Sequence, residues 1–163
     1  MALGDQLFLE IEGSQKMYVY VFDEDQSGNA VLLFPLEGLD LENPLAAGSR
    51  HRLPGKGDEV MKYWDVTSSG GSDVILVIAS AKRLEEIEGM LDQMAQAGDV
   101  ESMRLSAELE QVRGVAGLSP KSMEAPGGGE TNPLAGVREG LGVRAGNSDD
   151  VWVWEMRLSN PAP

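Results

Sequence analysis

The chain contains no cysteine and a single histidine, His51. Without thiols it has no disulfide framework, no thiolate zinc site and no thiol nucleophile. With one imidazole, a histidine-rich metal site is excluded, and a Ser-His-Asp triad would have to include His51. We therefore expect neither a cofactor nor catalytic residues.

Basic residues are also scarce. Lys and Arg number 13 against 27 Asp and Glu, which gives a net charge of −14 at pH 7. Proteins that bind nucleic acid neutralise its phosphates with clustered cations, so we expect no nucleic-acid partner. A partner would be neutral, cationic or apolar. It would be another protein or the rest of this protein's own polypeptide; the sequence predicts no oligomeric state.

Long hydrophobic runs are missing as well. The longest strongly apolar stretch, Val74 to Ala79, is far too short to cross a bilayer as a helix. We therefore expect no membrane insertion of this segment. The final SNPAP has the composition of a linker, so we expect a longer precursor and favour the cell envelope or periplasm as its location.

A series of strand-like segments is present. Alternating or continuous apolar residues indicate strands at 7–11, 17–22, 30–34, 73–80 and 151–158, with short edge strands at 51–53 and 60–66. The short polar loop between the second and third segments predicts a hairpin. In the last segment Trp152 and Trp154 share one face. We predict that this face is buried and that the segment pairs within the sheet built by the first strands.

The hydrophobic period changes after residue 80. An apolar residue recurs every three or four positions from Leu84 to Met94, which predicts an amphipathic helix capped by Ser80. A second helix is predicted from Asp99, followed by a Gly-rich loop. The carboxylates of the first helix are expected on its solvated face: Glu85, Glu86, Glu88 and Asp92.

Together these patterns predict a mainly β fold with a helical insertion. We expect one β-rich domain, residues 1–163, of antiparallel β-sandwich-like architecture. An α-helical hairpin and the Gly-rich loop form the insertion at residues 82–150.

One acidic loop resembles part of a metal site. Asp23, Asp25 and Ser27, followed by Gly28, match the first half of a calcium-binding loop. Calcium also needs a bidentate glutamate at the twelfth position, which is here Phe34, inside a predicted strand. We therefore interpret the loop as a hairpin turn, and the three residues remain an incomplete set of metal candidates.

His51 lies between Arg50 and Arg52. It could serve a hydrolase together with Ser68 and a distant carboxylate, but a surface histidine is the interpretation that we favour. With Lys56, the three residues form a concentrated positive patch on an acidic chain. We predict that Arg50, His51, Arg52 and Lys56 are interaction residues, which meet an acidic partner or the protein's own carboxylates.

Several segments, taken in order, resemble a known family. They are YVYVFDEDQSGNAVLLFP, NPLAAG, RHRLPG and a strand that ends in VIAS. The succession is similar to that of DUF4384, a bacterial family of domains of unknown function, over about residues 17–82. The resemblance implies a compact β-sandwich-like accessory domain, attached to signalling kinases, caspase-like peptidases or envelope proteins, with no known catalytic residues. The insertion at 82–150 departs from the family pattern.

We therefore expect a non-catalytic accessory or binding module of a larger signalling or cell-envelope protein. One alternative is a hydrolase-type enzyme that uses His51. Another is a calcium-stabilised envelope module.

Overall fold

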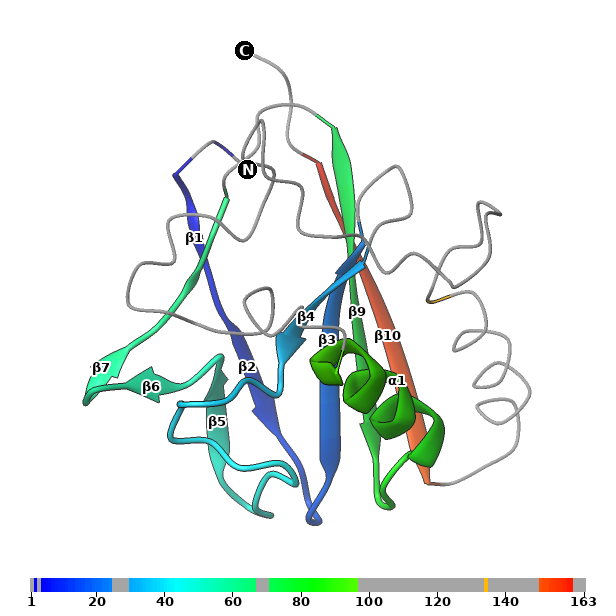
Figure 1. Cartoon of the computed structure of the whole chain (residues 1–163). Coiled ribbons are helices and arrows are strands. Elements are labelled where there is room, and N and C mark those ends of the chain that lie inside the picture. The colour runs from blue at the N-terminus through cyan, green and yellow to red at the C-terminus, as the bar shows by residue number, and fades with distance from the viewer. Residues whose placement is uncertain are drawn as a thin grey trace.

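The structure is a computed structural model, and it describes residues 2, 4–24, 30–66, 71–96, 134 and 150–159. Strands dominate these residues, and helix α1 (Glu85–Gln96) lies against the largest sheet (Figure 1). The strands are β1 (Gln6–Leu7), β2 (Leu9–Glu12), β3 (Tyr18–Glu24), β4 (Ala30–Phe34), β5 (Arg50–Leu53), β6 (Lys56–Gly57), β7 (Val60–Met61), β8 (Trp64–Asp65), β9 (Ser72–Ser80) and β10 (Val151–Ser159). The mainly β architecture predicted from the sequence is confirmed.

The central sheet has four antiparallel strands in the order β10-β9-β3-β4. Strands β3 and β9 lie in its middle, where β-branched and aromatic side chains are buried on both faces. Strand β4 pairs with β3, as the predicted hairpin requires. Strand β10 pairs with β9 from Val151 opposite Ser80 to Ser159 opposite Ser72. The prediction that the last strand returns to this sheet is confirmed.

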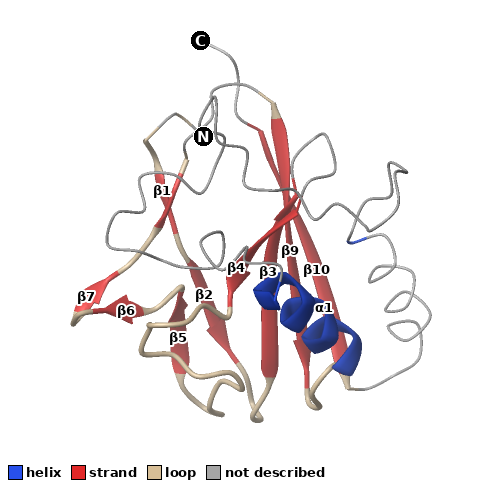
Figure 2. Ribbon diagram, in the orientation of Figure 1, coloured by secondary structure: helices blue, strands red, loops and turns tan. Residues whose placement is uncertain are grey.

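Helix α1 covers one face of the central sheet (Figure 2). Its buried residues Ile87 and Leu91, with Leu84 just before it, pack against Tyr20 and Phe22 of β3. The remaining buried members of this cluster are Ala30, Leu32, Leu76, Ile78 and Leu134. The predicted helix is therefore confirmed, and its apolar stripe makes one half of the core.

The opposite face of the sheet carries a second apolar cluster. Val19, Val21 and Val77 face it from β3 and β9. Leu53 of β5 is fully buried there, and Leu9 and Ile11 of β2 pack beside it. The antiparallel β2–β5 ribbon thus supplies much of the cover on this side. The β-sandwich-like arrangement stays a prediction, because the described strands form one four-stranded sheet and three two-stranded ribbons.

The segment predicted as one strand at 60–66 is divided between two ribbons. Strand β7 pairs with β6, whereas β8 pairs with β1. The β6–β7 turn is made by Asp58 and Glu59, whose φ angles of 51° and 63° are both left-handed. This is the geometry of a two-residue turn that matches the twist of a hairpin.

The prediction that Trp152 and Trp154 are buried is wrong. Their side chains are 43% and 67% exposed. Both lie on the face of the second cluster, but the buried members of that cluster come from other parts of the chain, and among β10 residues only Leu158 packs against it. Strand β10 is an edge strand of the central sheet. The described residues that cover this face of the sheet do not bury its tryptophans.

The two ends of the predicted insertion lie side by side. The Ala81 amide donates to the Asp150 carbonyl at 2.9 Å, and Lys82 Nζ lies 2.9 Å from Asp150 Oδ2. Ser80 does not cap the helix: it ends β9, and its Oγ accepts a bond from the Lys82 amide at 3.2 Å. The second helix and the Gly-rich loop lie outside the described residues. Within those residues, no helix is both long and apolar enough to span a membrane.

Candidate functional site

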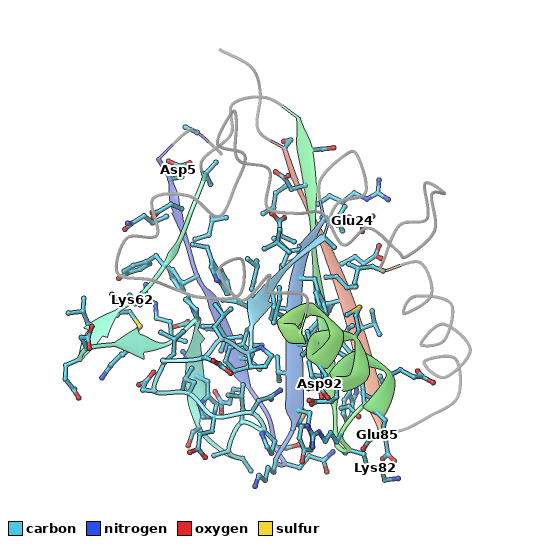
Figure 3. All side chains as sticks on the ribbon, in the orientation of Figure 1. Asp5, Glu24, Lys62, Lys82, Glu85 and Asp92 are labelled. Carbon is cyan, nitrogen blue, oxygen red and sulfur yellow. The ribbon has the colours of Figure 1, made fainter. Side chains whose placement is uncertain are left out.

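A groove of about 570 Å³ lies between α1 and the segment that follows β4. Buried Leu32 and Leu91 contribute to its apolar floor, together with the half-buried Leu36 and Leu41. Exposed carboxylates stand around it on both walls: Glu37, Glu42 and Asp92. Figure 3 labels Asp92 on the α1 wall. The groove therefore combines apolar surface with a negatively charged rim.

The α1 wall is attached to the sheet through Glu88. The buried Tyr20 hydroxyl of β3 donates a 2.6 Å hydrogen bond to Glu88 Oε1, and the Arg83 guanidinium donates a 2.8 Å bond to Glu88 Oε2. The bond from Arg83 lowers the pKa of Glu88, with help from the Tyr20 hydroxyl and against the effect of burial. Burial, and then the contact with Glu88, raises the pKa of Tyr20 well above its usual value. Glu88 is therefore held ionised beside a neutral phenol.

The opposite wall is fixed by Asn43. Its Oδ1 accepts from the Val19 amide at 2.8 Å, and its Nδ2 donates to the Val19 carbonyl at 2.9 Å. The side chain thus occupies the place of a neighbouring strand, because β4 pairs with β3 only from Val21 onward. Two residues further along the chain, Leu45 pairs with Met17 through two backbone hydrogen bonds. The wall consequently continues the edge of the central sheet.

Asp40 attaches the same segment to the backbone of Lys56 in β6. Its amide donates to the Lys56 carbonyl at 2.9 Å, and its Oδ1 accepts from the Lys56 amide at 2.5 Å. Gly55 lies directly against this contact, with a left-handed φ of 116°. A Cβ at residue 55 would lie 2.7 Å from Asp40 Oδ1 and 3.1 Å from Leu41 Cγ. Only glycine fits this approach of two loops.

The groove is suited to binding a cation that carries an apolar group. Its exposed carboxylates would meet the positive charge, while the leucines would cover the apolar part. Arg83 is the cation in its lining, and the Glu88 carboxylate already neutralises it. The net charge of −14 adds a long-range attraction for cations.

The predicted interaction patch lies elsewhere, on β5 and β6. The β2–β5 register places Glu12 opposite Arg50 and Glu10 opposite Arg52. Arg50 Nε lies 3.5 Å from Glu12 Oε2. The Arg52 guanidinium stacks on Phe8 at 3.7 Å from the ring centroid. The arginines therefore contact the chain's own groups, and their role toward an acidic partner stays a prediction.

The other residues of interest are scattered. His51 Nε2 lies 2.9 Å from the Ala46 carbonyl, and Ser68, its proposed hydrolase partner, is outside the described residues. Asp23 is buried within β3 instead of standing in a loop, while Asp25 and Ser27 are outside the described residues. The described part of the chain contains no cluster of three or more His, Asp or Glu residues that could hold a metal ion.

Sequence reasoning missed Glu88, which was expected on the solvated face of the helix with Glu85, Glu86 and Asp92. Those three are exposed as predicted, but Glu88 is half-buried. The spacing in the sequence could have indicated this burial. Glu88 lies four residues after Leu84 and three before Leu91, so it falls on the apolar stripe of the helix. A carboxylate in that stripe needs a buried donor, and Tyr20 provides one.

Comparison with known proteins gives one positive result. The profile of the family described as "Domain of unknown function (DUF4384)" matches residues 1–83, which include β1 to β9. The match begins well before the residues that suggested the resemblance, and it ends before α1 and β10. Searches of curated proteins and of solved structures found no match. Since the family profile covers just over half of the 163 residues, the chain belongs to the DUF4384 family of domains of unknown function.

Proposed function

We propose that the chain is a non-catalytic binding module that holds a cationic, partly apolar peptide segment in the groove between α1 and the segment 35–43. The observation that carries this proposal is the combination of an apolar floor with Glu37, Glu42 and Asp92 around a volume of about 570 Å³. The ligand belongs to another protein or to a further part of the same polypeptide. The module serves a larger signalling or cell-envelope protein, as the family resemblance implies.

Affinity and specificity come from different parts of the groove. Apolar contact with the floor contributes about 25 cal/mol per Å² removed from water. The rim carboxylates are exposed, so each ion pair contributes only about 0.2–1 kcal/mol. Their sum nevertheless discriminates a basic segment from an acidic one, because an acidic segment would be repelled by the same groups.

The walls support binding because they are anchored before any ligand arrives. The hydrogen bond between Tyr20 and Glu88 joins α1 to β3, and the two hydrogen bonds of Asn43 join the opposite wall to the same strand. A site whose walls are already ordered loses less conformational entropy on binding. The central sheet acts as the common base of both walls.

The proposal is tested with a labelled peptide of alternating lysine and leucine and its glutamate–leucine counterpart. We expect fluorescence anisotropy to show binding of the lysine peptide only, weakening as salt screens the rim charges. The triple variant Glu37→Gln, Glu42→Gln, Asp92→Asn keeps side-chain shape and removes three charges. It should weaken binding by about tenfold, which corresponds to about 1.4 kcal/mol.

A matched control removes three exposed carboxylates outside the groove, with Asp58→Asn, Glu59→Gln and Glu85→Gln. This control should change the dissociation constant by less than about twofold. Equal losses in the two triple variants would show that only net charge matters and would refute the groove as the site. Equal binding of the two peptides would refute the proposed ligand class.

A further inference from the structure

Strand β10 presents a long edge that the groove does not use. Its nine residues pair with β9 on one side, and no other described strand pairs with it. Trp152, Val153, Trp154 and Met156 are between 36% and 67% exposed. Edge strands of this length are usually protected by charged side chains, lysine above all, by proline or by a bulge, and the charges of β10 are Glu155 and Arg157. The sequence VWVWEMRLS has no lysine or proline, and its register with β9 is unbroken.

We propose that β10 pairs with β10 of a second copy of the chain, so that two central sheets join into one across a twofold axis. A twofold axis perpendicular to the sheet keeps each side chain on its own face. It also makes the new strand pair antiparallel, with one residue opposite itself at the axis. The strand's own sequence then decides which residue lies at the axis.

Charge complementarity selects Met156 as the central residue. In that register Glu155 of each copy lies directly opposite Arg157 of the other, so the axis generates two oppositely charged cross-strand pairs. Moving the axis to Glu155 would place two carboxylates opposite each other, which is destabilising. The second copy is thus a partner whose charge pattern matches the strand by symmetry.

The same register brings exposed apolar groups together on the other face of the strand. Met156 lies opposite its own copy, and Trp154 lies opposite Leu158 of the second copy. Trp154, 67% exposed in one chain, would lose part of its contact with water against Leu158 of the second copy. Pairing along β10 therefore accounts for the edge that no other described strand pairs with and for the exposure of Trp154.

Sedimentation equilibrium of the full chain tests the proposal, from low micromolar to several hundred micromolar protein. We expect a reversible shift toward twice the monomer mass of 17.5 kDa. Either Glu155→Arg or Arg157→Glu creates two like-charge pairs and should raise the dimer dissociation constant at least about tenfold. The double variant Glu155→Arg, Arg157→Glu restores opposite charges and should restore the dimer.

Glu59→Arg, in the exposed β6–β7 turn, is the matched control and should leave the dimer unchanged. A monomer at every concentration would overturn the proposal, as would a dimer that survives both single reversals. Failure of the double variant to restore the dimer, when it is folded by circular dichroism, would overturn the register. Peptide binding in the groove is measured separately, so the two proposals fail independently.

Discussion

The hydroxyl of Tyr20 lies 2.6 Å from Oε1 of Glu88, and this bond joins the middle of the central sheet to the helix that covers it. Tyr20 is fully buried, and Glu88 also accepts a bond from Arg83. Charge-assisted bonds in such surroundings are stronger than bonds between neutral groups. The contact fixes where α1 sits on the sheet and, with it, one wall of the groove.

Replacing Tyr20 by phenylalanine should lower the free energy of unfolding by about 1.5–3 kcal/mol, because a hydrogen bond to a charged group is lost. Urea denaturation measures this change. Tyr18→Phe is the control, since Tyr18 lies on the same face of β3 and is not bonded to Glu88. An equal effect of the two substitutions would show that the bond does not matter.

Acid should remove part of the stability that Glu88 provides. Its pKa in the folded protein is below the ordinary value of 4.5, so the folded state binds this proton less readily than the unfolded state does. The contribution is present above about pH 4.5 and is lost as the pH falls through the lowered pKa. The difference in unfolding free energy between the wild type and Glu88→Gln should therefore shrink below pH 4.5. A difference that is constant from pH 7 to pH 3 would contradict this account.

A side chain at residue 55 should displace the segment that contributes Leu41 to the groove. Gly38→Ala meets open space and carries only the cost of a left-handed φ of 81°, about 1 kcal/mol. Gly55→Ala adds a collision with Asp40 and Leu41, so we expect a loss of about 2–4 kcal/mol. Thermal unfolding of the two variants compares them, and a smaller loss for Gly55→Ala would be contrary to the structure.

The tryptophans should differ in their access to water in dilute protein. Trp154 is 67% exposed, whereas Trp64 is half-buried against the second cluster. Trp154→Phe should therefore remove the emission that acrylamide quenches most strongly, and Trp64→Phe should remove a more shielded component. Strong protection of Trp154 in the monomer would refute the exposed edge.

The local patterns predicted much of this fold. The β3–β4 hairpin, the buried strand β9 and the helix after it follow from hydrophobic period alone. The return of β10 to the sheet also followed from its alternation. That alternation misled us about Trp152 and Trp154, because a strand with one apolar face reads the same whether the face is covered or lies at an uncovered sheet edge.

The groove was beyond sequence reasoning for a different reason. Its walls come from residues 35–43 and from Arg83 to Asp92, about fifty positions apart, and neither segment carries a motif. Only the order of strands brings them together on one side of the sheet. Asn43 illustrates the difficulty. Its side chain can bond the backbone of Val19 only because β4 is shorter than β3 and leaves that residue without a partner strand on this side.

The proposed function is tested most directly by mapping the lysine–leucine peptide onto the protein by NMR with amide chemical shifts. The account predicts shift changes concentrated at Leu36, Glu42 and Asp92 in the wild type, and their loss in the triple variant of the rim. Changes concentrated on β10 or on the β2–β5 ribbon, with the groove amides unmoved, would contradict it.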